Sequence, residues 1–281
     1  MNTDEPLTYV YAVARQTEPL GKLLATLRGV GGAPVGLLAD PSDAGPAPLT
    51  FVVSPVPHGE FDETALKDHF EDLRWLEEVA RAHHDVVQAV AARATVLPLR
   101  LATVYQNDSR AGRALAGQHE TFARRLAELD AHTEYGVKIY LPPPAGPATP
   151  QHPADAGAAA PTTPGKAYLQ RRRAQHHVRE AVYGQAEQAA AAIEAIAARY
   201  TTQRVRHAPQ SGALSGPQEN VLNDAYLVPD EHAEQFRAAL ADAARDFPDL
   251  RVEVTGPWAP YSFAGPPAEA PDPAGTEERA P

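Results

Sequence analysis

Two pairs of adjacent histidines are the side chains best suited to chemistry in this 281-residue chain, which contains no cysteine. His83 and His84 fall in one stretch with helical periodicity, and His176 and His177 fall in another. Adjacent residues on a helix point about 100° apart, whereas two helical histidines that bind one ion are normally four residues apart. Each pair therefore indicates one packed and one solvated histidine. We expect neither a metal nor an organic cofactor.

The sequence also lacks the motifs typical of common enzymes. It has no phosphate-binding loop, dinucleotide fingerprint, nucleophile elbow or zinc-protease motif. The carboxylate pairs Glu77-Glu78 and Asp62-Glu63 fall on predicted helices without a partner base, so we interpret them as surface residues. The absence of cysteine excludes disulfides, thiolate metal sites and cysteine nucleophiles. We therefore expect a protein that is not an enzyme.

Three successive arginines, Arg171, Arg172 and Arg173, lie near the start of a long predicted helix. Positive charge near a helix N-terminus is mildly unfavourable, because the helix dipole is positive at that end. One interpretation is docking to an acidic partner or an anionic surface. The other is a solvated face that pairs with nearby carboxylates.

A short aromatic segment follows the last predicted strand. Residues 258–263 contain Trp258, Tyr261 and Phe263, and Pro257 and Pro260 stiffen the backbone beside them. Such a segment either folds back as a lid over the core or offers a rigid aromatic surface to a partner, and the two roles are compatible.

Composition narrows the possible partners and location. The formal net charge is −11, from 25 Lys and Arg against 36 Asp and Glu, so the chain as a whole repels nucleic acid. No apolar run approaches the roughly 18–20 residues of a membrane span. The first residues are acidic and polar, unlike a signal peptide. We expect a cytoplasmic protein with no membrane span and no nucleic-acid partner.

The first half of the chain predicts a separate α+β domain over residues 1–132. Residues 7–14 read as a mostly buried strand, and 35–39 and 49–54 as two further short strands. Apolar residues at three- and four-residue steps predict one long helix over 62–93 with Asp62 as its N-cap. An extended segment at 96–101 contains Pro98, which favours an edge or a bend. Two helices follow, over 107–116 and 118–130.

The second half predicts a ferredoxin-like domain over residues 133–264. Its expected order is strand, helix, strand, strand, helix, strand, at 134–141, 166–200, 202–208, 220–228, 231–247 and 250–255. The Ala-rich seam of the 166–200 helix suits packing within the chain, although a coiled coil is the alternative. Residues 142–165 contain eight prolines and seven alanines and predict a disordered insertion. Residues 265–281 predict a disordered tail.

Several segments, in order along the chain, resemble the GvpL/GvpF family of gas vesicle proteins. Residues 96–105 are similar to the family's VLPLRFGTVF-like segment, with Leu101-Ala102 in place of the usual Phe-Gly, and residues 134–140 are similar to its EWGVKVY-like strand, with Tyr135 for Trp. The other matching segments are 9–13, 166–169 with the arginines that follow, 223–228 and 256–263. The set spans about residue 7 to 264, and does not separate the L from the F subtype.

The resemblance implies an α+β protein of two domains, the second ferredoxin-like, with no catalytic residues. It implies an accessory role in gas vesicle assembly: the protein binds the small hydrophobic shell protein in the cytoplasm and assists its incorporation into the vesicle wall. Other gas vesicle accessory proteins are further expected partners. Two alternatives stay open, a minor structural component of the gas vesicle and a small-molecule-binding regulatory or enzyme domain.

The sequence also suggests where such a partner would bind. In a ferredoxin-like sheet the strands at 202–208 and 250–255 lie at the edges, and the former carries Arg204 and Arg206, which discourage unwanted pairing. The latter carries Val252 and Val254 on one face and leads into Trp258, Tyr261 and Phe263. A partner strand could add to this edge while the aromatic side chains cover its apolar groups.

Overall fold

The computed structural model describes residues 5–40, 42–43, 45–143, 164–210 and 218–265. The chain forms two compact units, one of residues 1–132 together with 258–281 and one of residues 133–257. Most of the insertion expected at 142–165 and nearly all of the tail expected at 265–281 lie outside the described residues.

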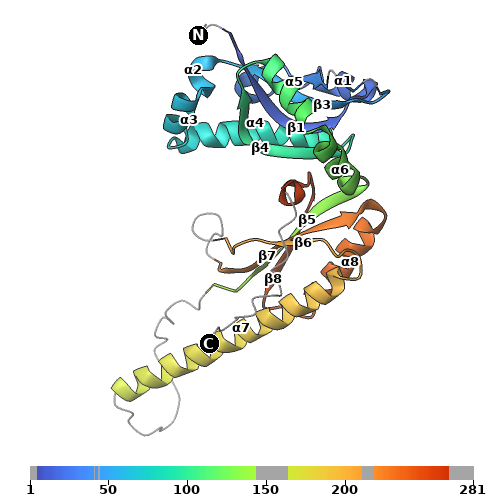
Figure 1. Ribbon diagram of the computed structural model, residues 1–281. Coiled ribbons are helices and arrows are strands. Elements are labelled where there is room, and N and C mark those ends of the chain that lie inside the picture. Colours follow the sequence, from blue (N-terminus) through green and yellow to red (C-terminus); the bar gives the residue numbers. More distant parts are fainter. Residues whose placement is uncertain (1–4, 41, 44, 144–163, 211–217, 266–281) are drawn as a thin grey trace, which may run out of the picture. The chain divides into compact units, whose positions relative to one another are not determined.

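The first unit contains a four-stranded antiparallel sheet (Figure 1). Its strands in sheet order are β2 (Gly36–Ala39), β3 (Leu49–Val56), β1 (Leu7–Arg15) and β4 (Val96–Tyr105). All residues of β1 except Arg15 are buried, which confirms the predicted buried strand. Pro98 lies on β4 at the sheet edge, opposite Ala12, as its missing N–H donor predicts.

Helices cover this sheet. They are α1 (Glu18–Leu24), the 3₁₀ turn η1 (Val30–Gly32), α2 (His58–Phe61), α3 (Glu63–His69), α4 (Leu73–Ala91), α5 (Asp108–Gly117) and α6 (His119–Leu129). The single helix predicted over 62–93 is wrong, because the chain breaks between α3 and α4. Asp62 caps α3 as expected, but Asp72 starts a second helix by accepting hydrogen bonds from the backbone N–H groups of Arg74 and Trp75.

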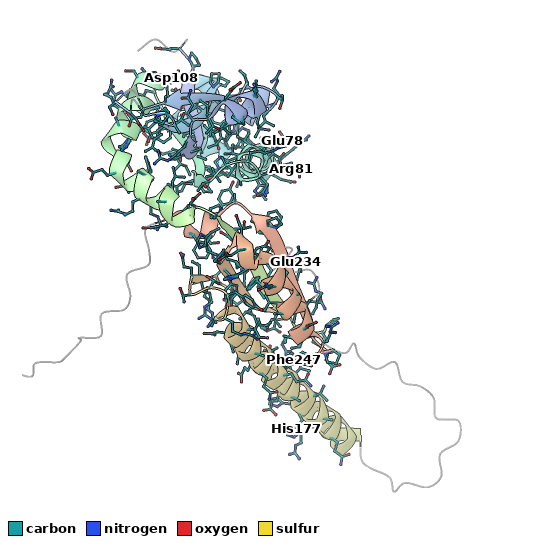
Figure 2. The ribbon with its side chains drawn as sticks, turned by 90° about the vertical axis from the view of Figure 1, so that its right-hand side faces the viewer. Glu78, Arg81, Asp108, His177, Glu234 and Phe247 are labelled. Atoms are coloured by element: carbon teal, nitrogen blue, oxygen red, sulfur yellow. The ribbon has the colours of Figure 1, made fainter. Side chains whose placement is uncertain are left out.

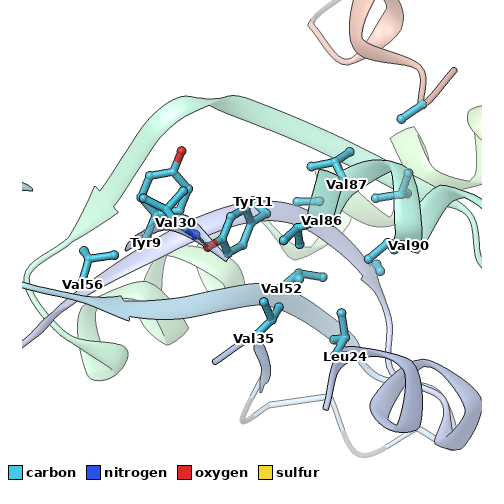
Figure 3. Close-up of a cluster of buried hydrophobic side chains, with 14 of the residues drawn as sticks. Tyr9, Tyr11, Leu24, Val30, Val35, Val52, Val56, Val86, Val87 and Val90 are labelled. Atoms are coloured by element: carbon cyan, nitrogen blue, oxygen red, sulfur yellow. Dashed lines mark hydrogen bonds between the residues drawn. The ribbon is translucent and has the colours of Figure 1, made fainter. Parts of the chain in front are cut away.

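A mixed aromatic and aliphatic core lies between β1, β3 and α4 (Figure 3). The Tyr11 hydroxyl accepts a hydrogen bond from the Val30 backbone N–H (2.8 Å) and donates one to Ser54 Oγ (3.0 Å). Ser54 Oγ in turn donates to the Pro34 carbonyl (2.8 Å). This chain of bonds satisfies the buried hydroxyls and ties the loop around Gly29 to the centre of the sheet.

The second unit contains the other four-stranded sheet (Figure 1). Its elements along the chain are β5 (His132–Tyr140), α7 (Pro164–Ala197), β6 (Arg204–Arg206), β7 (Asn220–Pro229), η3 (Asp230–His232), α8 (Ala233–Ala244) and β8 (Arg251–Trp258). The strand order is β6-β7-β5-β8, so β6 and β8 are the edges. The protein thus combines helices with two antiparallel sheets.

The C-terminal half of α7 packs into the core of this second unit. Ala186, Ala189, Ile193 and Ala197 are buried there together with Phe236 and Leu240 of α8. The Ala-rich seam therefore packs within the chain at this end, and small side chains allow the close approach. In the described ranges, no helix is both long and apolar enough to cross a membrane.

Candidate partner-binding surfaces

The aromatic segment at 258–263 packs on α4 and α6 of the first unit. The Ala259 backbone N–H donates a hydrogen bond to Gln88 Oε1 of α4 (3.0 Å). The Arg125 guanidinium of α6 donates to the carbonyls of Phe263 and Gly265, the latter at 2.9 Å. A 3₁₀ turn, η4 (Tyr261–Phe263), lies between these attachments. We call residues 258–265 the strap.

The three aromatic side chains of the strap have different environments. Phe263 is 8% exposed, and Tyr261 packs against the core of the first unit with its ring 6.0 Å from that of His84. The Trp258 ring lies 5.8 Å from His84, and the residue is 40% exposed. Tyr261 and Phe263 therefore close the core, and Trp258 presents apolar surface to solvent.

The predicted histidine pair lies beneath this strap. His83 is buried at 3% exposure, and its Nδ1 lies 2.9 Å from the Tyr9 hydroxyl, which also accepts from the Ala102 backbone N–H (3.1 Å). Burial lowers the pKa of His83 to about 4 and raises that of Tyr9 well above its usual value. His83 is thus a neutral, packed histidine. No group of three potential metal ligands occurs among the described residues.

The strand β8 lies at the edge of the second unit's sheet, and its valine side chains pack against the core of that unit. Val252 and Val254, which the sequence suggested for contact with a partner, pack against the core of this unit. Gly136 of β5 lies so close to β8 that a Cβ at its position would come within 2.7 Å of Thr255 Oγ1. Arg251 pairs with Glu253 (3.3 Å) and covers the Tyr140 ring at 3.9 Å.

The opposite edge, β6, is occupied by ion pairs. Asp224, 1% exposed, lies 3.1 Å from Arg206 Nε, and Glu194 of α7 lies 2.6 Å from Arg204. Charged side chains on an edge strand disfavour pairing with another strand. Of the three arginines at 171–173, all on α7, Arg172 and Arg173 are exposed, and the side chain of Arg171 is outside the described set.

Two features of the first unit had no clear sequence signal. Phe70 and Leu73, at the junction of α3 and α4, are 47% and 79% exposed, although both are apolar residues within the stretch predicted as one helix over 62–93. A surface cleft of about 480 Å³ is lined by Arg15, Thr17, Arg93, Ala94, Thr95, Leu126, Ala127 and Asp130. The Thr95 hydroxyl there donates a hydrogen bond to Asp130 (2.6 Å).

Comparisons with known proteins show what the whole chain is similar to. The sequence model described as "Gas vesicle synthesis protein GvpL/GvpF" matches residues 7–265. Gas vesicle protein L of Streptomyces sp. (strain CB03234) is 41% identical over 266 residues, covering 94% of this chain and 95% of that protein. Gas vesicle protein F of the same strain is 29% identical, covering 91% and 98%.

The fold is similar to that of solved members. The crystal structure of GvpF from Anabaena sp. PCC7120 aligns with a TM-score of 0.60 at 17% identity, covering 92% of this chain and 96% of that chain. GvpF from Microcystis aeruginosa aligns with the same TM-score at 18% identity, covering 92% and 99%. Because identity is this low, these two likenesses concern the fold alone.

Proposed function

Because the chain belongs to the GvpL/GvpF family of gas vesicle synthesis proteins, we propose that it is a non-enzymatic accessory factor that binds the small shell protein and assists its incorporation into the vesicle wall. The named relatives support the gas vesicle role. The step to shell-protein binding and to action in the cytoplasm is our inference, as is contact with other gas vesicle accessory proteins.

A physical argument favours this partner. A wall that keeps gas on one side must present an apolar face to it, so its subunit exposes apolar surface and unpaired strand edges before assembly. A binder with net charge −11 keeps such a complex dispersed, because like-charged complexes repel one another. The binder then needs an apolar contact or a free strand edge of its own.

The observation that carries the proposal is the exposure of Trp258. Its neighbours Ala259 and Phe263 are buried, and the backbone that follows it is held by Gln88 and Arg125, yet Trp258 is 40% exposed. A large aromatic ring on an anchored backbone loses little conformational freedom on binding, which is typical of residues that dominate an interface. In the second unit, the backbone edge of β8 is a separate element to which a partner strand could add.

We also propose that the second unit is a ferredoxin-like domain with the Pro/Ala-rich insertion at 142–165, and that the domain boundary lies near residues 132 and 133. The order β5-α7-β6-β7-α8-β8 along the chain and β6-β7-β5-β8 across the sheet support this assignment. Under this assignment the strap continues from the last strand of that domain.

The test is co-purification of the full chain with its shell protein, comparing wild type with Trp258→Ala. Truncation of an aromatic anchor costs roughly 2 kcal/mol or more, so we expect at least a roughly tenfold loss of affinity with an unchanged melting temperature. The matched control is Leu73→Ala, which removes another exposed apolar side chain (79% exposed) and leaves shell-protein affinity unchanged. Unchanged affinity in a folded Trp258→Ala variant would remove Trp258 from the interface, and no binding by the wild type would overturn the proposal.

A further inference from the structure

The N-terminal half of α7 is a basic helix that extends beyond the sheet of the second unit (Figure 1). The helix has 34 residues and so is about 50 Å long. Its fully buried side chains lie between Ala186 and Ala197. Every described side chain from residue 170 to 181 is exposed, and Figure 2 shows His177 near the outer end of α7. We call residues 170–181 the basic arm.

The charge of this arm is opposite to that of the chain. Residues 170–181 contain four Arg and one Glu, whereas the whole chain has a net charge of −11. Within the described part of the chain, Arg172 and Arg173 form no ion pair, and Arg179 pairs with Glu219 at 3.1 Å. Arg172, His176 and Arg179 follow one another at steps of four and three, so they share one face of the helix.

Such a helix gains little from its own contacts. Like charges on successive turns oppose each other, and the positive helix dipole at the N-terminus opposes them as well. The exposed Val178, at 64%, continues the stripe of Val182, Ala186 and Ala189 outward without a neighbour to cover it. The arginine face of the arm therefore matches a partner surface that carries carboxylates.

The first unit presents a surface of that kind at the junction of α3 and α4. Phe70 and Leu73 are exposed there, at 47% and 79%, and Asp68 and Glu71 flank them. Neither carboxylate has an ion-pair partner among the described residues, whereas Glu63, Glu77 and Glu78 nearby pair with Lys67, Arg81 and Arg74. Residues 60–85 hold nine Asp or Glu and three Lys or Arg. We call Asp68, Phe70, Glu71 and Leu73 the acidic corner.

We propose that the basic arm of one molecule docks on the acidic corner of a second copy of this chain. Arg172 and Arg173 meet Asp68 and Glu71. The two surfaces differ, so the contact is head-to-tail and leaves a free arm at one end and a free corner at the other. The chain therefore associates into open rows or closed rings. Exposed charges carry the contact, so it weakens with salt.

Sedimentation of the full chain over a concentration series, at low and at high ionic strength, tests this. We expect association that grows with concentration and declines with salt. Reversing the charges of the arm (Arg172→Glu with Arg173→Glu) or those of the corner (Asp68→Lys with Glu71→Lys) should each weaken the association by about tenfold or more. The control Arg110→Glu with Arg113→Glu, on the exposed face of α5, should associate as the wild type does.

Mixing the two charge-reversed variants shows whether their loss of association comes from charge repulsion or from misfolding. In each variant alone, the arm and the corner carry charges of the same sign and repel each other. In the mixture, the acidic arm of one variant fits the basic corner of the other, so the mixture should associate again. A monomer at every concentration in low salt would overturn the proposal, and so would a contact that does not depend on concentration. Wild-type association of both reversed variants, or a mixture that stays monomeric although both variants are folded, would overturn it equally.

Discussion

The Tyr9 hydroxyl lies 2.9 Å from Nδ1 of His83, although 74 residues separate the two along the chain. The contact joins the central strand β1 to the helix α4, and the Ala102 N–H of β4 donates to the same hydroxyl at 3.1 Å. A single buried hydroxyl therefore links β1, β4 and α4, and α4 is one of the two helices that hold the strap. Its partner His83 is 3% exposed and so must stay neutral for the core to remain closed.

This burial predicts a pH-dependent stability. The pKa of His83 is lowered from 6.5 to about 4 by burial, so the unfolded chain binds its proton at a higher pH than the folded chain does. Between these two pH values the unfolded state binds more protons, and stability therefore falls as the pH is lowered through that window. The loss from this residue is roughly 3 kcal/mol.

The check is denaturant unfolding of wild type and His83→Gln at a series of pH values from 7 to about 4. We expect His83→Gln to be less stable at pH 7 and to show a flatter pH dependence. His177→Gln, which changes a histidine with a 78% exposed side chain, is the control and should keep the wild-type slope. An unchanged slope in His83→Gln would contradict the assignment.

Gly29 is predicted to be intolerant of any side chain. A Cβ at this position would overlap the Tyr11 hydroxyl and come within 2.7 Å of Ser54 Oγ. Gly29→Ala should therefore lower the free energy of unfolding by about 2–3 kcal/mol, since overpacking displaces a hydrogen-bonded pair. Tyr11→Phe removes the hydroxyl, so in that background the same change should cost less. Gly21→Ala, where a Cβ meets nothing within 4 Å, is the control and should be neutral or stabilising.

Ala102 adopts a backbone conformation that suits glycine. Its φ is 58°, in the left-handed region, where the GvpL/GvpF-like segment usually has glycine. A Cβ there costs roughly 1–2 kcal/mol, part of which is offset by the greater freedom of glycine in the unfolded chain. We expect Ala102→Gly to raise the free energy of unfolding by about 1 kcal/mol. Ala92→Gly, at a φ of −68°, should lower it instead; a loss in both variants would refute the strain at Ala102.

Arg125 is predicted to hold the strap on the first unit. Replacing it with Met removes the donors to the Phe263 and Gly265 carbonyls but keeps much of the aliphatic stem. Hydrogen bonds from a charged donor contribute about 1.5–3 kcal/mol, so the strap should open more often. Hydrogen exchange of the peptide covering 258–265 should speed up by tenfold or more in Arg125→Met. Arg124→Met, on the adjacent exposed residue, should leave that exchange unchanged.

The local pattern determined much of the fold. Alternation and β-branched residues predicted the strands from β1 to β8, because a strand half-buried in a sheet needs apolar groups at every second position. Helical spacing predicted α5, α6 and α7 to within a few residues at their starts and at most of their ends. The gap between α3 and α4 was missed, because apolar periodicity continued across it and only the capping carboxylate of Asp72 marks the new start.

Which of the candidate binding residues are exposed depended on tertiary structure. The sequence grouped Val252, Val254, Trp258, Tyr261 and Phe263 as one apolar surface, whereas the fold packs both valines and Phe263 inward and leaves Trp258 exposed. An apolar pattern predicts that one face of an element is buried. Which other element buries that face depends on packing between residues far apart in the chain. The strap contacts His84, Gln88 and Arg125, which all precede it by more than 130 positions in the sequence. Arg125 and Phe263, for example, are 138 positions apart. No local signal encodes that pairing, since it follows from the shape that the folded first unit presents.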